Sequence, residues 1–133
     1  MPNATSVSDE GQVRAAALLA ARRIVTARLI ESLRNAGMAM PADVDDITAA
    51  LTAADPKDPR WVALSPYRLN WSLEVLTLVA DAFVERRGQR VRTPDVDAVA
   101  AALDAGATWT QIGDALSSTA PAAHERYRQR LQA

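Results

Sequence analysis

The sequence predicts an all-α protein, with a long N-terminal helix and two further helices followed by a C-terminal group of three short helices. Residues that favour helices, above all Ala, Leu, Arg and Glu, dominate the chain. Apolar residues recur at spacings of three and four, whereas strands would show alternation. Glycine and proline occur almost only between these periodic segments. With 133 residues, 49% of them hydrophobic, the chain is long enough to bury a core.

The first helix is expected to begin after Ser8 and to end at Gly37, where glycine allows a left-handed stop. Residues 1–8 are expected to be a disordered N-terminus. At about 1.5 Å per residue the helix is close to 40 Å long. A helix of this length either pairs with a second copy of itself or packs on its own chain, and the sequence leaves both readings open.

A second, short helix is expected to start at Pro41, with Asp43, Asp45 and Asp46 in its first turns, and to end near Ala54. These three carboxylates suit the positive end of a helix, and they lack the spacing of a calcium loop. Residues 55–59 contain two prolines, which push the residues before them away from helical geometry. This segment is therefore the clearest internal linker.

A third helix follows one turn at residues 61–64 and is expected to start either at Ser65-Pro66 or at Asn70. It runs through Phe83, and it is apolar nearly all round. Such a helix is expected at the buried centre of the fold. Two arginines and a glycine at 86–88 close it, and a basic connector follows at residues 89–92.

Three short helices are expected at the C-terminus. Thr93-Pro94 caps the first, which ends at Gly106, and Thr108 with Gln111 forms a capping box for the second. Gly113 falls where two crossing helices would come closest. Residues 117–119 form a tight turn, and Thr119 caps a last helix. The inner face of that helix is expected to hold Ala123, Tyr127 and Leu131.

Charge is unevenly distributed along the chain. The net charge is −1, but residues 1–85 carry eight basic and eleven acidic side chains, and residues 86–133 carry seven basic and five acidic ones. We therefore expect two regions, a helical dimerisation or effector domain at 9–88 and a second domain at 89–133. The positive charge that a phosphate backbone would attract lies in residues 86–133, toward the C-terminal end of the chain.

The residues from 102 to 127 carry a resemblance to a known family. The run Ala-Thr-Trp-Thr-Gln-Ile-Gly at 107–113, Leu116 before the turn, and Ala-Ala-His at 122–124 resemble the small helix-turn-helix segments of actinobacterial regulators, related to region 4 of sigma factors. The resemblance covers about the last 35 residues. It implies a recognition helix that starts at Thr119, with its early exposed residues facing DNA bases.

The chain departs from that pattern in the turn and at the start of the last helix. Such segments usually have glycine and an aliphatic residue in the turn, then polar or basic residues; here these positions hold Ser117, Ser118, Ala120 and Pro121. Neither Ala120 nor Pro121 has a side chain that can donate a hydrogen bond to a base. The candidate DNA-binding residues are Thr119, Ala120, His124, Glu125, Arg128, Arg90 and Arg92. His124 has a second reading, a partly buried position between the last two helices.

These observations predict a DNA-binding transcriptional regulator that binds double-stranded DNA as a homodimer. The alternative keeps the fold and makes the C-terminal unit an adaptor or inhibitor that binds another regulator or a polymerase subunit. No cysteine, glycine-rich phosphate loop or histidine–carboxylate pair at ligand spacing is present, so no enzyme, cofactor or metal site is expected. No export signal or apolar span is present, which favours the cytoplasm and no membrane contact.

Overall fold

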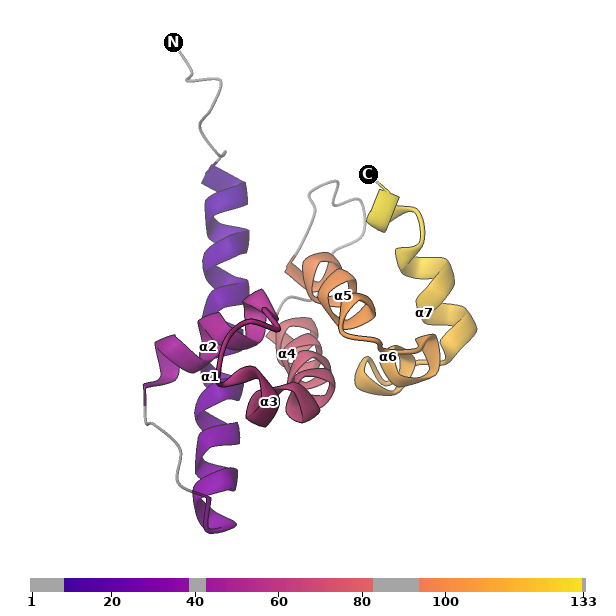
Figure 1. Cartoon of the computed structure of the whole chain (residues 1–133). Helices are drawn as coiled ribbons and strands as arrows, with labels where there is room; N and C mark the ends of the chain where they lie inside the picture. Colours follow the sequence, from indigo (N-terminus) through magenta and orange to yellow (C-terminus); the bar gives the residue numbers. More distant parts are fainter. Residues whose placement is uncertain (1–8, 39–42, 83–93, 133) are drawn as a thin grey trace.

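The computed structural model describes residues 9–38, 43–82 and 94–132 (Figure 1). Helices account for most of these ranges, and no strand occurs within them, which confirms the all-α class. Residues 1–8, Pro41 and the basic connector at 89–92 lie outside the described residues.

Helix α1, Asp9–Asn35, runs along one side of the molecule (Figure 1). It ends where the sequence predicts, because Gly37 adopts a left-handed conformation with φ +85°. The backbone N–H of Met38 then donates to the carbonyl of Leu33 at 3.0 Å, which satisfies an acceptor at the helix end. One side of α1 is buried at Leu18, Ala21, Val25, Ile30 and Leu33.

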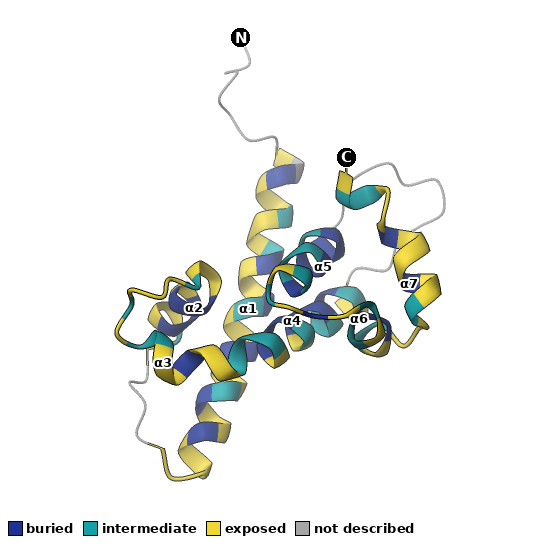
Figure 2. Ribbon diagram, turned by 45° about the vertical axis from the view of Figure 1, so that its right-hand side comes forward, coloured by how far each residue is buried: buried dark blue, intermediate teal, exposed yellow. Residues whose placement is uncertain are grey.

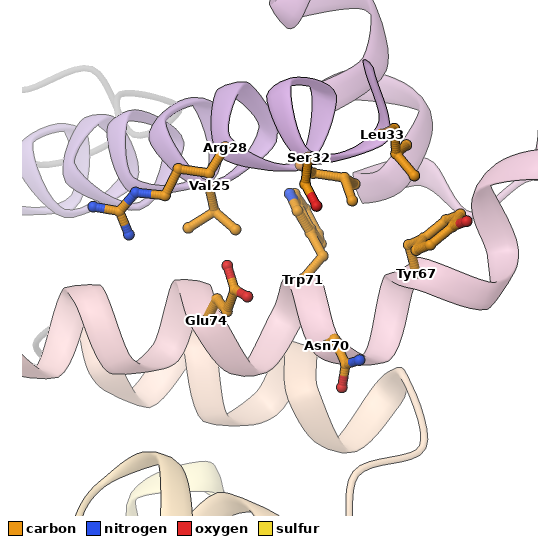
Figure 3. A pocket seen from close by; sticks show the side chains of 9 residues that line it. Val25, Arg28, Ser32, Leu33, Tyr67, Asn70, Trp71 and Glu74 are labelled. Carbon is orange, nitrogen blue, oxygen red and sulfur yellow. The ribbon is translucent and has the colours of Figure 1, made fainter. Parts of the chain in front are cut away.

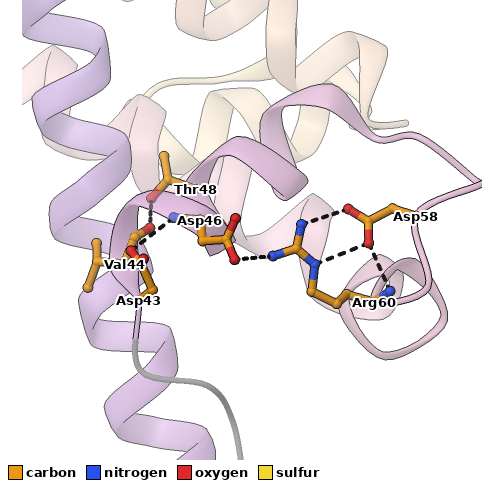
Figure 4. Close-up of polar contacts among 6 residues, drawn as sticks. All are labelled: Asp43, Val44, Asp46, Thr48, Asp58 and Arg60. Atoms are coloured by element: carbon orange, nitrogen blue, oxygen red, sulfur yellow. Dashed lines mark hydrogen bonds and ion pairs between the residues drawn. The ribbon is translucent and has the colours of Figure 1, made fainter.

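Helix α2, Val44–Ala53, begins later than predicted. Asp43 is its cap and lies outside the first turn, because the Asp43 carboxylate accepts from the backbone N–H of Asp46 at 3.2 Å. The helix ends at Ala54 in a left-handed conformation, as expected near that residue. The linker that follows contacts α2 through Arg60, which forms ion pairs with Asp46 of α2 at 2.7 Å and with Asp58 of the linker at 2.9 Å (Figure 4).

The third helical segment starts at neither of the two predicted positions. The chain is helical without interruption through α3 (Trp61–Leu64), a 3₁₀ turn η1 (Ser65–Tyr67) and α4 (Arg68–Ala82). The Ser65 side chain caps no helix there. Pro66 has no N–H and cannot donate the hydrogen bond of an α-helix, so a 3₁₀ turn joins α3 to α4. In this turn the N–H of Arg68 donates to the carbonyl of Ser65.

Helix α4 lies at the centre, as its apolar sequence predicts. It packs against α1, α5 and α6, and it buries Trp71, Ser72, Val75, Leu76 and Val79. The indole N–H of Trp71 donates to the hydroxyl of Thr26 at 3.0 Å, and the hydroxyl of Thr48 donates to the same oxygen at 2.9 Å. This buried polar contact joins α1, α2 and α4.

The C-terminal helices are α5 (Pro94–Asp104), α6 (Trp109–Ala115) and α7 (Ala120–Tyr127). The last helix is shorter than predicted: it stops at Tyr127, and a 3₁₀ turn η2 (Arg130–Gln132) follows. That tighter turn contacts α5 and leaves Leu131 half-buried against the core.

The buried residues form one connected core that extends from Leu18 on α1 to Tyr127 on α7 (Figure 2). The packing of α5 against α4 and α1 joins the N-terminal and C-terminal helices. The domain boundary expected between residues 88 and 89 lies outside the described residues.

Candidate nucleic-acid interface

Helices α6 and α7 form a crossed pair at one end of the molecule (Figure 1). The capping box at the start of α6 is present as predicted. The N–H of Gln111 donates to the Thr108 hydroxyl at 3.2 Å, and the N–H of Thr108 donates to the Gln111 side chain at 2.9 Å. These two hydrogen bonds fix the start of α6 at Trp109.

The turn between the helices closes on Ser117, which takes a left-handed conformation with φ +56°. The N–H of Ser118 donates to the carbonyl of Gly113 at 2.7 Å, and that of Ser117 donates to Asp114 at 3.2 Å. This pattern of hydrogen bonds usually has glycine at the left-handed position, because a side chain there crowds the backbone. The serine in the turn therefore preserves the geometry at a conformational cost.

Gly113 lies where the two helices approach most closely, as the sequence predicts. A methyl group at this position would come within 2.9 Å of the Thr119 carbonyl carbon and 3.0 Å of the Ala120 nitrogen. These are backbone atoms, which cannot move aside without shifting the start of α7. The crossing of α6 and α7 therefore requires glycine.

The inner side of α7 is held by two buried residues and one hydrogen bond. Ala123 and Tyr127 are buried, and the Tyr127 hydroxyl donates to the Asp95 carboxylate on α5 at 2.6 Å. Burial first, and then the hydrogen bond to Asp95, raise the pKa of Tyr127 above its ordinary value. The neutral phenol is therefore the form that connects α7 to α5.

The outer side of α7 is exposed, and it carries four of the seven predicted DNA-binding residues. Thr119 caps the helix, its hydroxyl accepting from the N–H of Ala122 at 3.2 Å. Glu125 and Arg128 are exposed and form an ion pair at 3.2 Å. Because exposed ion pairs contribute about 0–1 kcal/mol, this pair can open when another ligand approaches. A fifth predicted residue, Ala120, is half-buried.

The partly buried position that was the second interpretation of His124 is not found, although its ring contacts α6. His124 is exposed, and its ring packs edge-on against Trp109 of α6, with the ring centroids 5.1 Å apart. Trp109 is half-buried against the core. The contact leaves the imidazole accessible.

The charge of residues 94–132 is the feature of the candidate interface that suits DNA least. Residues 94–132 hold three arginines and five acidic residues, so their formal charge is negative. The excess of positive charge in the C-terminal part of the chain comes from the four arginines between residues 86 and 92. The predicted contacts Arg90 and Arg92 are among them, and both lie outside the described residues.

Sequence reasoning missed Asp95, which positions α7 from the first turn of α5. Asp95 follows the proline that opens α5, and an acidic residue in that place is usually explained by the helix dipole alone. The sequence therefore gave no sign of its hydrogen bond to Tyr127, 32 residues away. The residues described contain no group of three or more side chains arranged to hold a metal ion.

No known family model, curated protein or solved structure matches this chain. Over the residues that the structure describes, no helix has both the length and the apolar character needed to cross a membrane.

Proposed function

We propose that the chain is a DNA-binding transcriptional regulator that reads DNA with α6 and α7 as a helix-turn-helix. The observation that carries the proposal is the division of α7 into two sides. The inner side is anchored by Ala123 and Tyr127, and the outer side leaves His124, Glu125 and Arg128 exposed. A recognition helix needs this combination of a fixed backbone and exposed side chains.

Base contacts in this proposal come from the later part of α7 and from Arg128, which follows its last residue. Arg128 is the residue suited to guanine, because its planar guanidinium can donate two parallel hydrogen bonds to that base. Glu125 can accept from cytosine once its pair with Arg128 has opened. The first turn of α7 adds little sequence reading, because Ala120 has no polar side chain and Pro121 has neither a polar side chain nor an N–H.

Phosphate contacts in this proposal come chiefly from Arg90 and Arg92, with Thr119 at the start of α7. A single helix-turn-helix with so few hydrogen-bond donors to DNA binds weakly. The proposal therefore includes a homodimer that engages two half-sites about one helical turn, roughly 34 Å, apart. Support for the dimer comes from α1. Val13 and Ile24 are exposed on that helix, and eleven residues of an α-helix return to nearly the same side.

The test is a fluorescence-anisotropy titration of the full chain with mixed genomic duplexes, repeated at several salt concentrations. Binding is expected at about 50 mM salt and falls as salt rises, because phosphate contacts release bound cations. Arg128→Gln is expected to weaken binding, because it removes the donor assigned to guanine. Arg34→Gln makes the same charge change on α1 and should leave binding unchanged. Absence of binding at about 50 mM salt contradicts the proposal.

A second candidate function is an adaptor that uses the same helices to bind a protein. The observation in its favour is the negative charge of residues 94–132, together with a first turn of α7 made of Ala120, Pro121 and Ala122. Both features suit a protein surface better than a phosphate backbone. Pull-down from a lysate with and without nuclease separates the two: a partner retained after nuclease treatment favours the adaptor, whereas capture of DNA fragments favours the regulator.

A further inference from the structure

A pocket of about 540 Å³ lies between α1 and α4, on a part of the molecule that the proposed DNA contacts do not use (Figure 3). Its floor is apolar, with Val25 and Leu33 from α1 and Trp71 from α4. All three are buried, and Val25 and Trp71 belong to the connected core. The volume lies within the range of about 300–1,000 Å³ that small-molecule sites occupy.

The polar residues of the pocket stand at its rim. Arg28 of α1 and Glu74 of α4 are both exposed, and they flank the same end of the pocket (Figure 3). Within the described part of the chain, neither side chain has a hydrogen bond or an ion pair, although several other arginines of the chain do. Two opposite charges at one end of an apolar pocket, each without a partner, are suited to a ligand that carries both charges.

The other end of the pocket has no charged side chain, although the uncharged polar residues Ser32 and Asn70 also line the pocket. Leu33 and Tyr67 lie there, and Trp71 lies between this end and the charged end (Figure 3). The indole ring is held in place because its N–H donates to Thr26 at 3.0 Å. A ligand with charged groups at Arg28 and Glu74 would therefore lay an apolar body over Trp71, toward Leu33 and Tyr67.

We infer that this pocket binds an α-amino acid with a large apolar side chain. The ligand carboxylate accepts from the Arg28 guanidinium, and its ammonium group donates to the Glu74 carboxylate. Transfer of the ligand's own apolar side chain from water into the pocket supplies the affinity, and the two charges supply the selectivity. The proposed DNA contacts involve other residues, and the test of this inference uses no DNA.

The experiment is a titration of the ¹⁵N-labelled full chain with L-phenylalanine, followed by two-dimensional NMR. The chain has three tryptophans, and their indole N–H signals report on different places. The Trp71 signal is expected to shift saturably, while those of Trp61 and Trp109 stay in place, because neither lines the pocket. No shift of the Trp71 signal up to about 10 mM L-phenylalanine overturns the inference.

Three analogues test the chemistry of the ligand. Phenylalaninamide lacks the carboxylate, 3-phenylpropanoate lacks the ammonium group, and glycine lacks the apolar side chain. Each is expected to bind at least about tenfold more weakly than L-phenylalanine, because each loses one of the three contacts. An analogue that lacks one charge and binds as tightly as the amino acid overturns the assignment of a zwitterionic ligand.

Paired variants test the residues. Arg28→Gln and Glu74→Gln are each expected to weaken binding at least about tenfold. Arg34→Gln on α1 and Asp81→Asn on α4 make the same charge changes on the same helices outside the pocket, and they should bind as the parent chain does. The unchanged Trp61 and Trp109 signals verify that each variant folds. Equal affinity of all four variants overturns the inference.

Discussion

Tyr127 shows how one side chain can position a whole helix. Its ring is fully buried, and its hydroxyl reaches the Asp95 carboxylate, which is buried as well. A hydrogen bond to a charged acceptor contributes about 1.5–3 kcal/mol, more than one between neutral groups. The bond also gives α7 a directional contact, which the apolar packing of Ala123 cannot supply.

Tyr127→Phe is expected to lower the free energy of unfolding by about 1–3 kcal/mol at neutral pH, because it removes a donor to a buried carboxylate. Urea denaturation measures this loss. Tyr67→Phe is the control, because the Tyr67 hydroxyl only reaches the sulfur of Met38 at 3.8 Å in an exposed contact. Equal losses in the two variants would contradict the role given to Tyr127.

The same tyrosine predicts a sensitivity to alkali. Its pKa is raised in the folded chain, so the folded state holds the phenol proton more tightly than the unfolded state does. The stability that this difference contributes is fully present below the ordinary tyrosine pKa of about 10, and it is lost as the pH rises beyond that value. The parent chain should therefore lose stability more steeply above about pH 10 than Tyr127→Phe does, as thermal unfolding across that range will measure.

Ser117 occupies a left-handed position that glycine fills without strain. Ser117→Gly is expected to raise the free energy of unfolding by about 0.5–1 kcal/mol, since the relief of backbone crowding exceeds the entropy that glycine adds to the unfolded chain. Ser118→Gly, one residue further, gains no such relief and should stabilise nothing. Chemical denaturation of the two variants compares them directly.

At the scale of elements, the crossing of α6 and α7 depends on the absence of a side chain at Gly113. Gly113→Ala is expected to cost about 1–3 kcal/mol, because the new methyl group meets backbone atoms at 2.9 to 3.0 Å. Thr110→Ala, on the exposed side of the same helix, should change stability by less than about 0.5 kcal/mol. A stable Gly113→Ala variant with unchanged spectra would show that the two helices can separate at no cost.

The junction between α2 and α3 predicts a dependence on acid. The hydrogen bonds that Arg60 donates lower the pKa of Asp58 from its ordinary value. A lowered pKa in the folded chain contributes stability above the ordinary aspartate pKa of about 3.9, and that stability is lost as the pH falls below it. The parent chain should unfold at a higher temperature than Asp58→Asn at pH 7, with the difference shrinking in acid; Asp81→Asn is the control.

At the scale of the whole molecule, α1 provides the surface for the proposed dimer. Val13 is 65% exposed and Ile24 46% exposed, although α1 packs on α2, α4 and α5 along its other side. Ile24→Glu is expected to shift the chain from dimer to monomer in multi-angle light scattering at matched concentrations, because it puts a charge in an apolar contact. Val62→Glu changes a still more exposed residue on α3 and should leave the dimer intact. A monomeric parent chain would remove the dimer from the proposal.

Local patterns in the sequence determined the helical class, the stop at Gly37, the capping box at Thr108 and the close approach at Gly113. These features depend on residues within a few positions of one another, so helical spacing and the chemistry of caps are sufficient to predict them. The bond from Tyr127 to Asp95, the continuous helix through Ser65, and the unpaired charges beside Trp71 were decided by the tertiary structure. Each depends on which segments pack together across the core, and a single sequence does not record that information.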